Sequence, residues 1–103
     1  MQEFDDITEF EWDRGNDVKN WTKHGLSQKE IEEAFKGFKI AFPDEKHSGK
    51  EQRFCLIGLT DALQIIFVVF TSRIKKVRVI SARTASAFER ELYEKTVKRY
   101  SKI

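Results

Sequence analysis

The sequence predicts an α+β fold, in which a small antiparallel β-sheet packs against helices on one face. Two helix-capping boxes, an apolar run typical of a buried strand, and Gly- or Pro-containing turns between the segments predict it. The predicted order is β-α-α-β-β-β-α, with a further short strand after the second helix. The 103 residues are enough for one domain, which we expect to span residues 1–103.

The first half of the chain predicts a short strand followed by two helices. The strand covers residues 10–13, and the first helix covers residues 16–24. The second helix begins with a capping box, in which the side chains of Ser27 and Glu30 each accept a hydrogen bond from the other residue's backbone N–H. Apolar residues then recur at helical spacing, and Gly37 ends the helix.

The second half predicts most of the sheet and the last helix. The expected strands cover residues 39–42, 52–60, 63–72 and 77–83. Pro43 is expected to stop the first of them, and Gly58 to mark a bulge in the second. The strand at 63–72 is apolar on both faces, which predicts a central position. A second capping box, Ser86 with Glu89, opens a helix that continues almost to the end of the chain.

Charge is distributed unevenly, although the net charge is only +2. Residues 1–17 carry seven acids and one base, whereas residues 73–103 carry ten bases and three acids. The basic third favours a phosphate backbone or an acidic protein as partner. The single cysteine, Cys55, and the absence of a signal-peptide profile or membrane span predict a cytoplasmic protein without membrane contacts. No phosphate loop, zinc spacing or Ser-His-Asp arrangement is present, so we expect neither metal nor cofactor.

Two arginines mark the ends of the apolar hairpin formed by the last two strands. Arg73 lies at its turn and Arg83 at its open end, roughly 20 Å away at about 3.3 Å per residue. Arginine matches phosphate with a planar fork, although each could instead pair with a neighbouring carboxylate. The antiparallel order predicts two clusters, Glu51/Arg53/Arg73 with His47, and Gln64/Arg83/Arg90/Tyr93.

Several short strings, taken in order and spacing, resemble the BrnT family of bacterial type II toxins. They are Phe10-Glu11-Trp12-Asp13, Asn20-x-x-Lys23-His24-Gly25, His47-Ser48 with Glu51 and Arg53, Ile57-Gly58, Thr71-x-Arg73, Ile80-Ser81-Ala82-Arg83-x-Ala85 and Glu89-Arg90-x-x-Tyr93. Two positions depart from the family pattern, which usually has Gly-Arg where this chain has Leu63-Gln64 and often has lysine where it has Asn16.

The resemblance implies a RelE-like fold and a ribonuclease toxin that cleaves RNA without a metal and inhibits translation and growth. It also implies a ribbon-helix-helix antitoxin in a 2:2 complex, with DNA contacted only through that antitoxin. Since Gln64 replaces a guanidinium, a second reading is a non-catalytic module that binds an antitoxin and contributes to transcriptional autoregulation.

Metal-free RNA cleavage needs a base, an acid and cations at the phosphorane. We expect Arg83 to stabilise the transition state, Tyr93 or Glu51 to move protons, and Arg73 with Lys23 to hold phosphate. The expected RNA-binding residues are Arg53, Arg90, His47 and Gln64, of which His47 is also a candidate base. The Arg83 end is slightly favoured for the chemistry, and the Arg73 end for gripping RNA or for a structural ion pair.

Overall fold

The computed structural model describes residues 9–12, 25–47 and 49–100, and it confirms the α+β class. The predicted helix at residues 16–24 lies outside the described residues. In chain order the elements are β1 (Glu9–Glu11), α2 (Gln28–Glu33), β2 (Lys39–Asp44), the short 3-10 helix η1 (Glu45–His47), β3 (Arg53–Leu59), β4 (Ile65–Arg73), β5 (Lys76–Thr84) and α3 (Ala87–Tyr100).

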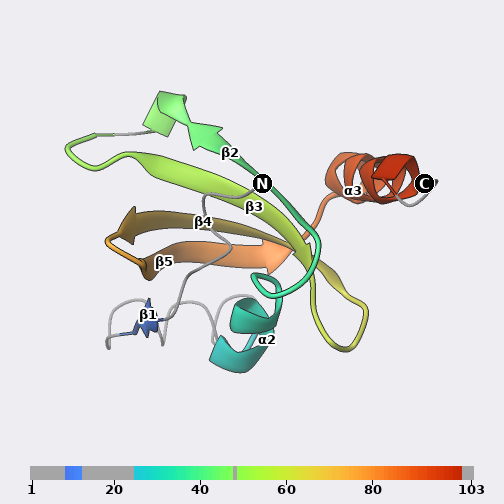
Figure 1. Cartoon of the computed structure of the whole chain (residues 1–103), viewed down its shortest axis with the longest axis horizontal. Helices are drawn as coiled ribbons and strands as arrows, with labels where there is room; N and C mark the ends of the chain where they lie inside the picture. The colour runs from blue at the N-terminus through green and yellow to red at the C-terminus, as the bar shows by residue number, and fades with distance from the viewer. Residues whose placement is uncertain (1–8, 13–24, 48, 101–103) are drawn as a thin grey trace.

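Five strands form one sheet in the order β1-β5-β4-β3-β2, so β4 is central as its two apolar faces predicted (Figure 1). Neighbouring strands run antiparallel, with one exception: β1 pairs with β5 in parallel. A tight hairpin would force antiparallel pairing, but these two strands are separated by most of the chain, so either direction is open to them. The sheet is therefore mixed rather than purely antiparallel.

Two predictions about strands β2 and β3 were wrong. Pro43 does not stop β2, which continues to Asp44. Since β2 is the outermost strand, a residue without an N–H is tolerated there. Gly58 is not a bulge, because its register with both neighbouring strands is regular. It is instead a point of close approach: a Cβ at Gly58 would lie 2.4 Å from the backbone oxygen of Ala34.

Helix α2 covers one face of the sheet, which we call the near face. The capping box between Ser27 and Glu30 is present, with both reciprocal hydrogen bonds. Trp12 ties β1 to the helix by donating to Glu32 at 2.8 Å. The apolar side chains of the near face pack beneath α2 in one core, formed by Leu26, Ile31, Ala34, Phe35, Leu56, Ile66, Val68, Phe70, Val77, Val79 and Ala82.

Helix α3 lies beyond the end of the strands, at the opposite end of the sheet from the β4–β5 turn (Figure 1). Its predicted capping box is present, since Ser86 and Glu89 exchange both hydrogen bonds. Tyr93 is its buried residue, whereas Phe88 and Leu92 are exposed. No helix among the described residues is long and apolar enough to cross a membrane.

Two turns hold exposed apolar residues in a left-handed backbone conformation. Leu63, between β3 and β4, has φ +66° and is 76% exposed. Ile74 and Lys75, between β4 and β5, have φ +37° and +67°, and Ile74 is 95% exposed. Glycine adopts this conformation without strain, and a branched side chain does not. Leu63 and Ile74 therefore hold a backbone conformation that glycine would adopt with less strain.

Candidate functional site

The predicted site residues separate to the two ends of the β4–β5 hairpin. We call one group the tip cluster and the other the α3-end cluster. The tip cluster comprises the predicted residues Glu51, Arg53 and Arg73, together with Thr71 and Arg78, beside the β4–β5 turn. The α3-end cluster comprises Gln64, Arg83, Glu89, Arg90 and Tyr93. Phe67 pairs with Arg83 and Lys76 with Arg73, so the two arginines lie at opposite ends of the paired strands, as the sequence predicted.

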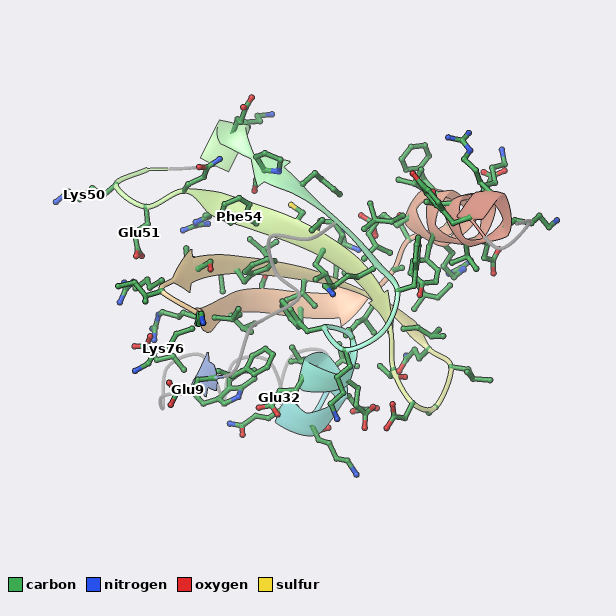
Figure 2. All side chains as sticks on the ribbon, in the orientation of Figure 1. Glu9, Glu32, Lys50, Glu51, Phe54 and Lys76 are labelled. Atoms are coloured by element: carbon green, nitrogen blue, oxygen red, sulfur yellow. The ribbon has the colours of Figure 1, made fainter. Side chains whose placement is uncertain are left out.

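Arg73 and Glu51 form a two-pronged ion pair at the tip. Nη2 of Arg73 donates to Oε1 of Glu51 at 2.9 Å, and Nε donates to Oε2. The carboxylate side chain reaches from the β2–β3 connection toward the hairpin, while Lys50 points away from the fold (Figure 2). Both partners are near the solvent, with 52% of the Arg73 side chain and 43% of the Glu51 side chain exposed. The bond from Arg73 holds the pKa of Glu51 below its usual value of 4.5.

Beneath this pair, one row of side chains crosses all five strands on the far face, the side away from α2. Asp44 pairs with Arg53, Thr71 pairs with Arg78, and Arg78 pairs with Glu11. Phe54 pairs with Phe70 on the near face, so the next position outward places Arg53 beside Thr71 on the far face. The row therefore has carboxylates at both edges, an arginine inside each, and a threonine at the centre.

Thr71 is the unusual member of the row. Its residue is 3% exposed, and its hydroxyl oxygen is buried with no hydrogen-bond partner among the described residues. Sequence reasoning noted Thr71 only as part of a family string and left Arg78 out of the site. Strand alternation from Phe70 could have placed both on the far face, but the missing partner of the hydroxyl is visible only in three dimensions.

Arg83 is anchored more tightly than Arg73. It donates to both carboxylate oxygens of Glu89, at 2.8 and 3.0 Å, and to the backbone oxygen of Thr84 at 3.2 Å. Its guanidinium also lies 4.3 Å from the ring centre of Phe67. Burial raises the pKa of Glu89, but the bonds from Arg83 and Ser86 outweigh burial and lower it. Since Glu89 also caps α3, this pair joins the sheet to the helix.

Tyr93 packs α3 against the rest of the fold. It is 5% exposed, and its hydroxyl donates to the backbone oxygen of Phe38 at 2.9 Å. Burial raises its pKa. The same residue lines an apolar groove of about 590 Å³, whose walls include Glu33, Phe38, Leu59, Leu63, Tyr93 and Val97. Neither Arg73 nor Arg83 lines this groove.

The structure shows fewer contacts for the other predicted site residues. Arg90 donates to the backbone oxygen of Ala85 at 3.3 Å. Gln64 is exposed, and its backbone N–H donates to the hydroxyl of Thr60. Lys23 and the side chain of His47 lie outside the described residues. Within the described part of the chain, no three His, Cys, Asp or Glu side chains are grouped so as to hold a metal ion.

The tip cluster can therefore perform ionic chemistry. It holds an ionised carboxylate at neutral pH, beside an arginine that keeps its charge and has three further N–H donors beyond the two given to Glu51. A carboxylate can accept a proton, and an arginine can bind a phosphate oxygen. In the α3-end cluster, Arg83 has more contacts within the protein than Arg73 has, and the tyrosine hydroxyl is buried.

Comparison with known proteins identifies a matching family and a similar solved structure. A family model described as "Ribonuclease toxin, BrnT, of type II toxin-antitoxin system" matches residues 12–89. The crystal structure of the Brucella abortus ribonuclease toxin BrnT is similar, with a TM-score of 0.59 and 29% sequence identity; the match covers 77% of this chain and 97% of that chain. No curated protein matches the chain.

Proposed function

Because the chain belongs to the BrnT family of ribonuclease toxins of type II toxin–antitoxin systems, we propose that it cleaves RNA without a metal ion, at the tip cluster. The observation that carries this proposal is the ion pair of Glu51 and Arg73, a base and a cation that lie in contact and remain accessible to solvent. RNA needs access to both groups, and both are already exposed to solvent.

The chemistry follows from the two groups. The Glu51 carboxylate takes the proton of a 2′-hydroxyl, and the resulting oxygen attacks the adjacent phosphorus. The bond from phosphorus to the 5′-oxygen breaks, leaving a 2′,3′-cyclic phosphate and a 5′-hydroxyl that takes its proton from water. Arg73 donates to the phosphate oxygens as their negative charge grows, and Arg53 binds a neighbouring phosphate.

The ion pair itself does not prevent this role. An exposed pair between long side chains contributes little to stability, because water screens its charges and both side chains lose freedom when they meet. A phosphate can therefore take over donors of Arg73 at little expense in free energy. The pair also keeps both side chains beside each other before the substrate arrives, which favours a productive geometry.

The α3-end cluster supports this chemistry less well. Three contacts already occupy Arg83, and its partner Glu89 also caps α3 by accepting a hydrogen bond from the backbone N–H of Ser86. The Tyr93 hydroxyl is buried and engaged with Phe38, so it is poorly placed to exchange protons with a substrate. We therefore assign Arg83 and Tyr93 to holding α3 in place.

The family implies an antitoxin protein as partner. We propose that this antitoxin is a ribbon-helix-helix protein that forms a 2:2 complex and alone contacts DNA. In this proposal, RNA cleavage in the cytoplasm inhibits translation and growth until the antitoxin binds. An antitoxin segment over the tip cluster would block the base and the phosphate donors together.

The decisive experiment is incubation of the purified chain with RNA in EDTA. We expect fragments ending in a 2′,3′-cyclic phosphate, and their loss in Glu51→Gln, which keeps the shape of the side chain but cannot accept the proton. Glu91→Gln is a matched control, because Glu91 lies on α3 in an exposed pair with Lys95. RNA that stays intact beside tight antitoxin binding would instead establish a non-catalytic module that only binds its antitoxin.

A further inference from the structure

The hydroxyl of Thr71 stands out from every other polar group that the structure describes in the tip cluster. It is buried without a hydrogen-bond partner among the described residues. A buried hydroxyl that lacks a partner destabilises a protein, and native structures hold few of them. Valine has nearly the same shape and would avoid this loss, so the threonine needs another explanation.

The surroundings of Thr71 indicate what its hydroxyl could bind. Arg78 is its partner on β5, and Arg53 lies beside it on β3, each about 4.8 Å away across the sheet. Both arginines are half-buried, and each takes part in interactions within the fold. Arginines on two sides of a hydroxyl donor form a set that suits an oxyanion, because all three groups can donate and two carry positive charge.

We infer that Thr71, together with Arg53 and Arg78, forms a phosphate-binding site for the RNA backbone on the far face of the sheet, next to the Glu51–Arg73 pair. This inference rests on the proposed function and adds to it the position of a second phosphate. Thr71 and Arg73 are two residues apart on β4 and so share one face of the sheet, which makes the two sites neighbours.

The burial of the hydroxyl is compatible with this role. Its neighbours in the row are arginines, whose long side chains can turn toward a phosphate and uncover what lies between them. The bound phosphate oxygen then supplies the acceptor that Thr71 lacks in the free protein. The hydrogen bond forms only in the complex, so its full strength contributes to binding rather than to folding.

The test is Thr71→Val, measured for stability and for RNA binding. Binding uses a single-stranded oligonucleotide with 2′-O-methyl groups, which cannot be cleaved because the attacking hydroxyl is blocked. We expect the melting temperature to rise by about 4–8 °C, because an unpartnered polar group is removed. We expect the Kd for the oligonucleotide to rise about tenfold, because one hydrogen bond to a charged group is lost.

Thr60→Val is the matched control, since Thr60 is equally buried but its hydroxyl accepts a hydrogen bond from Gln64. It should lower the melting temperature and leave oligonucleotide binding unchanged. A hexaglutamate peptide, as a second probe, should bind wild-type protein and Thr71→Val alike; weakening of peptide binding alone would identify a protein interface and overturn the inference.

Other outcomes separate this inference from the proposed function. If wild-type protein cleaves RNA but Thr71→Val binds the oligonucleotide normally, the phosphate site is refuted and the ribonuclease proposal stands. A lower melting temperature in Thr71→Val would mean that the hydroxyl already has a partner in the free protein, which also refutes the site. If wild-type protein neither binds nor cleaves RNA, both proposals fail.

Discussion

The two ends of the β4–β5 hairpin carry the same pair of residue types in different settings. At the tip, Arg73 meets a glutamate from a connecting segment, and both side chains extend into solvent. At the other end, Arg83 meets a glutamate that also caps α3, and it lies over Phe67. Moving an arginine away from several structural contacts costs more free energy than moving one held by a single exposed carboxylate. The second kind of arginine is therefore more available to a ligand. Anchoring, rather than residue type, distinguishes the two ends.

The largest expected effect separates the two arginines. Arg73→Ala should reduce the rate of RNA cleavage in EDTA about 100-fold, the loss typical of removing one preorganised donor at a developing negative charge. Arg83→Ala should leave this rate within about threefold of wild type, and should lower stability by about 1 kcal/mol through loss of the partly exposed pair with Glu89. Single-turnover kinetics measure the cleavage rates, and thermal unfolding measures the change in stability. The reverse order of rates would move the active site to the α3 end.

The strained turn near α3 gives the next largest effect. Leu63→Gly should raise the free energy of unfolding by about 1 kcal/mol, because glycine adopts the positive φ of this position without steric strain. Since Leu63 is exposed and remote from the tip, cleavage should not change. Urea denaturation measures the gain; a loss of stability would mean that Leu63 contributes packing that its exposure does not suggest.

Tyr93→Phe tests whether the tyrosine hydroxyl serves structure or catalysis. The change leaves the carbonyl of Phe38 without its donor, so stability should fall by about 1 kcal/mol. The cleavage rate should stay the same at every pH. A rate loss larger than the change in folded fraction would restore Tyr93 as a proton carrier.

The smallest effect is the pH dependence that Glu89 contributes. The pKa of Glu89 is lower in the folded chain than its usual value of 4.5, so its stabilisation is complete above pH 4.5 and is lost as the pH falls through the lowered pKa. Glu89→Gln should therefore lose less stability than wild type between pH 5 and pH 3. Chemical denaturation across this range measures the difference, which equal slopes for the two proteins would contradict.

Local patterns predicted the parts of the fold that depend on local interactions. Both capping boxes formed, because each is completed within four residues, and the doubly apolar strand became the centre of the sheet. The antiparallel order also predicted that Glu51 would lie near Arg73. The parallel pairing of β1, the contact of Gly58 with Ala34 and the continuation of β2 through Pro43 depend on tertiary neighbours, and the sequence does not disclose them.

The candidate site was predicted only in part, because it also depends on tertiary neighbours. Charge identified Arg73 and Arg83, but their different anchoring depends on which carboxylate each one meets in space. Thr71 carries no charge and lies in an apolar strand, so composition gave no reason to select it. Its significance comes from a buried hydroxyl between two cross-strand arginines, which is a property of the register.

The most direct test of where RNA binds is NMR mapping of backbone amide shifts upon titration with the 2′-O-methyl oligonucleotide. We expect the largest shifts in residues 51–54 and 71–78, and small shifts around Arg83 and along α3. Shifts concentrated at residues 83–93, with residues 71–78 unchanged, would contradict it.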